Sequence, residues 1–204
     1  MKKNKISKNW IIKQNKDLYF RKSKIFGYRS RSAYKLIEMN DKFKFIKRDT
    51  FLLDLGSSPG GWSQVASKII KNGKILSVDI KQTDKIKRVD FIQGDFIDEK
   101  IHFKIIDYFG ANKVDVIMSD MAENTSGNKN MDSFKTGELC LKAMDLAKEI
   151  LVNDGVFLCK IFMGSIFVEI DKKSKKYFKN VIKYKPKASK KESKEIYIYC
   201  KGVL

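Results

Sequence analysis

The sequence of 204 residues predicts a single α/β domain, in which a mostly parallel, seven-stranded sheet carries helices on both faces. Short apolar runs alternate with stretches of helical spacing along the chain, and this order builds a parallel sheet from strand–helix–strand units. No internal repeat and no linker rich in Pro, Gly or Ser divides the chain. Its hydrophobic fraction of 43% is enough for one core at this length.

Seven short apolar runs are predicted as strands. The first, residues 50–55, ends at the turn Gly56-Ser-Ser-Pro-Gly-Gly61, which is typical of a buried strand that stops abruptly. The last two strands are expected to form an antiparallel pair that closes the sheet. The other predicted strands cover residues 74–79, 89–93, 114–119, 156–161, 181–184 and 195–200.

Apolar residues three and four positions apart predict the helices between these strands. A short helix runs through Tyr34, Leu36 and Ile37, and either Ser30 or Ser32 is expected to cap it. The helix after the glycine-rich turn shows its spacing from residue 62 to residue 70. The remaining predicted helices cover residues 101–109, 131–152 and 164–178.

The composition excludes several classes of protein. No window approaches eighteen consecutive apolar residues, which excludes a membrane-spanning helix. The first twenty residues lack the apolar segment and cleavage site of a secretory signal, so we expect a cytoplasmic protein. Cys140, Cys159 and Cys200 are odd in number and widely spaced, and they indicate neither disulfides nor a metal site. We expect these cysteines in the core and the single histidine, His102, at the surface.

Positive charge is concentrated at both ends of the chain, whose formal net charge is +19. Residues 1–50 carry 16 basic and 4 acidic side chains, and residues 171–204 carry 12 and 3. This asymmetry favours a polyanionic partner such as a nucleic acid. The alternative is a compositional bias towards lysine, because only five of the 43 basic residues are arginines.

Acidic residues lie at or beside the ends of four predicted strands, where ligands bind in open α/β sheets. Each alone would cap a turn, but four in succession indicate a binding site. They are Asp54, Asp79, Asp95 and Asp120. The turn after the first strand has glycines that admit a close ligand, but it lacks the G-x-G-x-x-G pattern of dinucleotide sites. Asp79 after the second strand therefore favours S-adenosylmethionine over NAD.

Four further polar residues are distant in sequence but converge at one edge if the sheet is built as predicted. They are Lys35, Asp120, Lys160 and Glu195. Lys160 is the unusual member, because an ammonium group in an apolar strand is costly unless it is paired or neutral. Taken alone, Lys35 would be a surface residue of a helix and Glu195 a residue of an edge strand.

Six motifs occur in a fixed order over about residues 15–202: YRSRSAYKL, DLGSSPGGWSQV, QGDF, VIMSDMAENTSG, CKIFMG and KASKKESKEIYIYCKG. Together they resemble the FtsJ/RrmJ family of ribose 2′-O-methyltransferases, which act on large-subunit ribosomal RNA. The resemblance implies a Rossmann-like, S-adenosylmethionine-dependent methyltransferase fold. It divides the chain into a basic N-terminal extension, residues 1–28, and a catalytic core, residues 29–202.

The resemblance also implies roles for individual residues. A catalytic Lys-Asp-Lys-Glu set falls on Lys35, Asp120, Lys160 and Glu195. Contacts to S-adenosylmethionine fall on Gly60, Trp62, Asp79, Asp95 and Asp120. One departure is Glu123, where members of the family commonly have a proline, and it leaves the four catalytic positions intact.

The implied activity is methylation of a ribose 2′-hydroxyl, that of a uridine, in 23S-type RNA of the large ribosomal subunit, by a monomer that needs neither a metal nor a membrane. The alternatives are the same chemistry on a tRNA or an mRNA cap, and a non-catalytic RNA-binding protein of ribosome assembly. An intact catalytic set argues against the last. We expect the RNA to cross the face between the N-terminal basic segment and residues 183–194, with Arg29 and Arg31 as phosphate contacts.

Methyl transfer to a ribose hydroxyl is an in-line displacement that requires removal of the hydroxyl proton. Lys160 serves as the base only as a neutral amine, a form that burial and Lys35 favour and that Asp120 and Glu195 oppose. Alternatively, Asp120 and Glu195 orient the amine and the ribose. A general base contributes roughly 10²–10⁴-fold, and positioning about 7–11 kcal/mol, so positioning is the larger effect.

Overall fold

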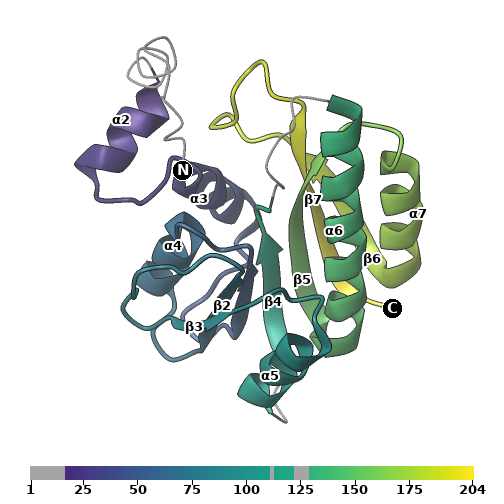
Figure 1. Cartoon of the computed structure of the whole chain (residues 1–204), viewed down its shortest axis with the longest axis horizontal. Coiled ribbons are helices and arrows are strands. Elements are labelled where there is room, and N and C mark those ends of the chain that lie inside the picture. The colour runs from purple at the N-terminus through teal and green to yellow at the C-terminus, as the bar shows by residue number, and fades with distance from the viewer. Residues whose placement is uncertain (1–16, 111–112, 122–128) are drawn as a thin grey trace, which may run out of the picture.

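The computed structural model describes residues 17–110, 113–121 and 129–204. Within these residues a single seven-stranded sheet has the strand order β3-β2-β1-β4-β5-β7-β6 (Figure 1). This confirms the predicted α/β class and the number of strands. The strands are β1 (Leu52–Leu55), β2 (Ile75–Asp79), β3 (Asp90–Gln93), β4 (Val114–Ser119), β5 (Leu151–Phe162), β6 (Phe178–Tyr184) and β7 (Glu195–Val203).

The first five strands are parallel, and β7 is antiparallel to both of its neighbours, β5 and β6. The last strand in the chain is therefore inserted inside the sheet rather than added at its edge. Its register with β5 places Tyr197 opposite Lys160 and Glu195 opposite Phe162. The antiparallel strand thus brings its first residues to the edge where the parallel strands end.

Helices cover both faces of the sheet, as predicted (Figure 1). Successive strand residues point to opposite faces, so Leu52 packs under α3 and α4, whereas Leu53 packs under α5, α6 and α7. Strands buried on both sides in this way read as continuous apolar runs. The helices are α2 (Leu18–Ile25), α3 (Ala33–Phe43), α4 (Gly61–Ile69), α5 (Glu99–Phe109), α6 (Lys129–Ile150) and α7 (Phe167–Tyr177).

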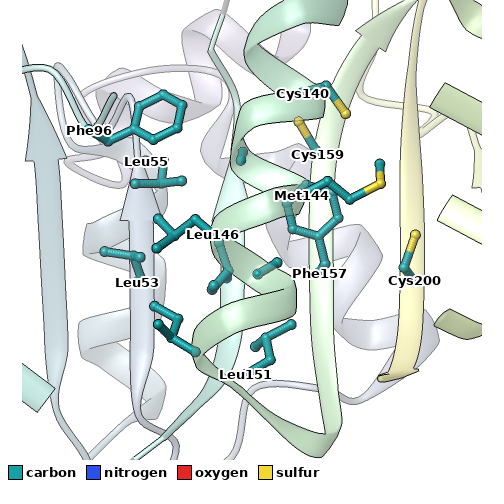
Figure 2. Close-up of a cluster of buried hydrophobic side chains, with 14 of the residues drawn as sticks. Leu53, Leu55, Phe96, Cys140, Met144, Leu146, Leu151, Phe157, Cys159 and Cys200 are labelled. Carbon is teal, nitrogen blue, oxygen red and sulfur yellow. The ribbon is translucent and has the colours of Figure 1, made fainter. Parts of the chain in front are cut away.

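The core beneath α6 contains the three cysteines, as expected. Figure 2 shows Cys140 of α6 and Cys159 of β5 pointing toward each other, with Cys200 on the neighbouring strand. The hydrogen bond with Cys159, together with burial, raises the pKa of the Cys140 thiol. A thiol that stays protonated packs as a small apolar group, and these residues therefore stabilise the core. His102 is partly exposed and lies 3.0 Å from Glu149, as expected of a surface residue.

Three local features differ from the sequence prediction. Helix α2 lies within the extension for which no element was predicted, and the Asp17 carboxylate caps it by accepting from the backbone N–H of Tyr19 and Phe20. Strand β5 starts at Leu151, inside the range predicted as helix, because a register shift against β4 takes up residues 152–155 as a bulge. Ser32 is the first residue before α3, but its hydroxyl contacts Ser30 instead of capping the helix.

Among the described residues, no helix combines the length and apolar character needed to cross a membrane.

Candidate active site

A cavity of about 610 Å³ opens at the carboxyl ends of β1, β2, β3 and β4. Its size is in the range of small-molecule sites. Three of the four predicted strand-end acids line it, namely Asp79, Asp95 and Asp120. The other lining residues are Gly56, Ser58, Val78, Ile80, Lys81, Gly94, Phe96, Met121, Lys135 and Leu139.

The glycine-rich turn, residues 56–61, forms one wall of this cavity. Two features exclude a side chain at Gly56. Its φ is +69°, and a Cβ atom there would lie 2.0 Å from Cγ of Met121. Asp79 holds the inner side of the turn, because its Oδ2 accepts the backbone N–H of Ser58 at 2.8 Å. Its Oδ1 accepts the backbone N–H of Lys81 at 2.7 Å. The carboxylate therefore fixes the turn and the start of the next loop together.

Gly60 and Trp62 do not line this cavity. Gly60 adopts a φ of +104° at the start of α4. The indole N–H of Trp62 donates to the carbonyl of Ser32, and its ring packs near Tyr197 on the other side of the turn. Their predicted contacts with the cofactor stay predictions.

The four residues of the predicted catalytic set lie in one continuous chain of polar contacts. Lys35 Nζ is 2.7 Å from Glu195 Oε1 and donates to Tyr197 Oη at 3.2 Å. Tyr197 Oη donates to Asp120 Oδ1 at 2.6 Å. Lys160 Nζ lies 3.2 Å from the same oxygen and donates to the backbone carbonyl of Asp120 at 2.5 Å. The chain thus runs Glu195–Lys35–Tyr197–Asp120–Lys160.

Four different elements supply this chain. Lys35 extends from α3, Asp120 follows β4, Lys160 belongs to β5, and β7 provides Glu195 and Tyr197. Both lysines and Glu195 are buried to more than nine-tenths, at 7%, 7% and 8% exposure. Charges this deep are tolerated because each has a partner of opposite sign.

The charges of the lysines control the ionisation of Asp120. Burial alone would raise the pKa of Asp120, but Lys160 and Lys35, with the hydrogen bonds from Tyr197 and Lys160, hold it below its usual range. Burial and the neighbouring carboxylates Asp120 and Glu195 raise the pKa of Tyr197 far above its usual range. Asp120 is therefore an anion and Tyr197 a neutral hydrogen-bond donor at physiological pH.

Sequence reasoning missed Tyr197. It is fully buried, and its hydroxyl contacts both Lys35 and Asp120. A signal was available in the alternation of β7, since residues two apart in a strand point to the same face. Glu195 and Tyr197 therefore had to share a face.

Asp54, the remaining strand-end acid, lies beneath the turn and does not line the cavity. Its Oδ2 accepts the Ser63 hydroxyl at 2.5 Å, and that hydroxyl lies 2.7 Å from the hydroxyl of Ser77. Burial, opposed by the hydrogen bond from Ser63 and assisted by the charges of Asp120 and Asp79, raises the pKa of Asp54 to about 7.

On the expected RNA face, the structure places Arg29 and Arg31 against protein groups, and their contacts with phosphates stay predictions. The guanidinium group of Arg31 pairs with Asp17 at 2.8 Å and donates to the carbonyl of Ala188 at 2.5 Å. That of Arg29 donates to backbone carbonyls only, those of Pro59, Asp84 and Lys85. The guanidinium groups of both arginines are bonded to protein groups and thereby connect neighbouring segments of the chain.

The connection between β6 and β7 presents lysines instead. Glu38 of α3 accepts the backbone N–H groups of Lys187 and Ala188, and Ala188 and Ser189 are buried against the domain. This anchoring leaves Lys187, Lys190, Lys191 and Lys194 exposed. Figure 1 shows the connection and α2 at the same end of the molecule. The predicted position of Glu123 lies outside the described residues.

The fold and the strand-end cavity define a class: the Rossmann-like, S-adenosylmethionine-dependent methyltransferase fold. Solved structures support this at the level of the fold, for example a methyltransferase of Streptococcus mutans in complex with SAH, at a TM-score of 0.54 and 12% identity over 85% of this chain and 96% of that one. The model of the FtsJ-like methyltransferase family matches residues 28–203, and the chain belongs to that family. The resemblance of the six motifs is thereby confirmed.

Relatives cover almost the whole chain. A Pelagibacter ubique protein named ribosomal RNA large subunit methyltransferase E is 52% identical over 98% of each chain. A protein of the same name from Chromobacterium violaceum is 42% identical over 99% of each chain. A Plasmodium falciparum structure, named as that of a ribosomal RNA methyltransferase, superimposes with a TM-score of 0.78 at 34% identity, over 87% of this chain and 99% of that one.

Proposed function

We propose that this protein transfers a methyl group from S-adenosylmethionine to the 2′-hydroxyl of a ribose in large-subunit ribosomal RNA. The chain of contacts from Glu195 to Lys160 carries the proposal, because it passes through Asp120, which also lines the strand-end cavity. The names of the relatives support the large subunit as the substrate. The choice of a uridine rests on the resemblance of the motifs.

The cavity suits the cofactor. Each carboxylate oxygen of Asp79 accepts one backbone N–H and keeps a lone pair for a ribose hydroxyl of the cofactor. Asp95 lies beyond the end of β3 and lines the same cavity, which makes it the candidate partner of the adenine. When bound, S-adenosylmethionine supplies an electrophilic methyl group on a positively charged sulfur.

Lys160 is the proposed base for the ribose hydroxyl. In the free protein Lys160 is an ammonium paired with Asp120. We propose that it acts as the base after releasing one proton to solvent, when its two contacts with the carbonyl and the carboxylate of Asp120 use the two N–H bonds of the amine. The lone pair of that amine is then directed away from Asp120 and takes the hydroxyl proton as the oxygen attacks. Asp120 orients the nitrogen and compensates the charge that develops on it. Lys35 and Glu195 form the second ion pair, which orients the ribose.

Substitution of Lys160 separates chemistry from binding. We expect Lys160→Ala to reduce methyl transfer by roughly 10²-fold or more while the affinity for SAH changes little, because the amine acts on the RNA hydroxyl. Calorimetric titration with SAH and single-turnover methyl transfer measure the two quantities. Lys173→Ala is the matched control, since Lys173 pairs with Asp145 between α6 and α7, away from the cavity. Near-normal turnover of Lys160→Ala would contradict the role of Lys160.

The substrate is tested by mapping 2′-O-methylation across total RNA from cells with and without this protein. We expect one methylated uridine of the large-subunit RNA to disappear. Loss of a mark in tRNA or at an mRNA cap instead would replace the substrate and keep the chemistry. The protein is proposed to act as a monomer in the cytoplasm, where the large subunit is available, and gel filtration measures its oligomeric state.

A further inference from the structure

The segment of residues 27–32, between α2 and α3, lies against the outer side of the glycine-rich turn. The side-chain amide of Gln64 holds it from α4, because its oxygen accepts the backbone N–H of Arg29 and its nitrogen donates to the carbonyl of Gly27. A Cβ atom at Gly61 would lie only 2.1 Å from the hydroxyl oxygen of Ser30. A glycine at position 61 is therefore needed for residues 27–32 to pack this closely against the turn.

Arg29 is the side chain of this segment that reaches both the turn and the loop after β2. Its Nη1 donates to the carbonyl of Pro59 at 3.2 Å and to that of Asp84 at 2.7 Å. Its Nη2 donates to the carbonyl of Lys85 at 3.0 Å. A planar guanidinium is suited to bonding several carbonyls at once, which a lysine ammonium does less well.

The two backbone segments that Arg29 joins each form a wall of the cofactor cavity. Gly56 and Ser58 of the turn line it, and so do Ile80 and Lys81 at the start of the loop. Asp79 connects the same two segments from within the cavity, through the backbone N–H groups of Ser58 and Lys81. Arg29 connects them from outside. The separation of the walls is thus fixed on both sides of the cavity.

We propose that Arg29 is a positioning residue for S-adenosylmethionine, and that it sets the separation of the two cavity walls rather than contacting RNA phosphates. The proposal rests on the cofactor part of the proposed function. A cavity whose walls are held in place binds its ligand without an ordering cost, and loss of the guanidinium restores that cost. Since the cofactor contacts themselves remain, affinity falls while the chemistry of the bound complex is retained.

The experiment compares Arg29→Ala with Arg31→Ala, a substitution two residues along the same segment that removes contacts with Asp17, Ala188 and the ring of Tyr19 and none with the two cavity walls. Calorimetric titration with SAH is expected to show an affinity lowered about tenfold for Arg29→Ala and unchanged for Arg31→Ala. Arg29→Lys keeps the positive charge but loses the planar guanidinium that bonds several carbonyls at once. We therefore expect this variant to bind SAH as weakly as Arg29→Ala. In steady-state methylation, KM for S-adenosylmethionine should rise while kcat stays near the wild-type value.

Thermal unfolding without ligand identifies variants that fail to fold, and Arg29→Lys then serves in place of Arg29→Ala. Unchanged SAH affinity in a folded Arg29 variant would overturn the proposal. An equal loss of affinity in the Arg31 variant would also overturn it, because the effect would then not depend on the two walls. Failure of the wild-type protein to bind SAH would instead count against the proposed function.

Discussion

At the scale of single residues, Tyr197 joins two ion pairs that would otherwise be separate. Its hydroxyl accepts from Lys35 and donates to Asp120, so the geometry of the pair Lys35–Glu195 depends on that of the pair Asp120–Lys160. A buried hydroxyl with both partners satisfied orients its neighbours more strictly than an exposed one. We therefore assign to Tyr197 the orientation of Asp120, and through it of Lys160.

Tyr197→Phe tests this assignment. Removal of the hydroxyl leaves Lys35 and Asp120 each without one buried partner, which should cost about 1–3 kcal/mol of unfolding free energy. Methyl transfer should fall while SAH affinity is preserved, since Tyr197 does not line the cavity. Denaturant unfolding and single-turnover kinetics measure the two effects. Tyr199→Phe is the control, because Tyr199 stacks on Phe43 farther along β7. Equal turnover in the two variants would show that Tyr197 only fills space.

At the scale of elements, β1, β2 and α4 meet at a buried polar contact beneath the cofactor turn. The carboxylate of Asp54 accepts the hydroxyl of Ser63 on α4, and that hydroxyl in turn lies 2.7 Å from the hydroxyl of Ser77 on β2. Burial, with the hydrogen bond from Ser63 opposing it, raises the pKa of Asp54 to about 7, well above its value in an unfolded chain. The protonated form is therefore the one that the folded protein stabilises.

The sign of the resulting pH dependence follows from linkage. Between about pH 4 and pH 7 the folded protein keeps a proton on Asp54 that the unfolded chain releases, so this contribution to stability is complete at the low end and is lost as pH rises. Its size is at most about 4 kcal/mol. Asp54→Asn should remove this dependence. Urea unfolding of both proteins over that range measures it, and parallel pH profiles would rule out the titration of Asp54.

Local patterns predict elements and strand ends well because both depend on neighbouring residues. The run of residues 50–55 and the glycines after it are enough to place β1, its turn and the acids at the strand ends. Helix α2 escaped prediction because it is short, and contacts between distant residues such as Tyr19 and Tyr34 hold it in place. The contacts of Arg29, Glu38 and Tyr197 were not predicted because they also join residues that are distant in sequence. No spacing rule relates residues 29 and 84, or residues 38 and 187.

At the scale of the whole molecule, part of the positive charge of a chain with a formal net charge of +19 lies on two segments at the cofactor end (Figure 1). Exposed basic residues lie on α2, namely Arg21, Lys22 and Lys24, and on the connection between β6 and β7. Both surround the edge where Lys160 and Asp120 meet. We propose that the RNA passes between them, and we therefore expect binding to depend steeply on salt and weakly on base identity.

A double substitution, Lys190→Ala with Lys191→Ala, tests this surface. Filter binding of large ribosomal subunits over a salt series should show weaker binding and a slope reduced by roughly one for each lost phosphate contact. Lys100→Ala with Lys104→Ala is the control, because α5 lies at the opposite end of the molecule (Figure 1). An unchanged slope, or an equal change in the control, would mean that RNA does not cross the connection.

The insertion of β7 between β5 and β6 has a consequence for biosynthesis. While the ribosome is still adding residues before position 195, β5 lacks its neighbour on one side and exposes an apolar edge that invites aggregation. The register partner of Lys160 is Tyr197, so the polar chain of the site closes only when β7 slides into this gap. The nascent chain therefore gains the last two strands of its sheet and the closed polar chain of the site in the same late step.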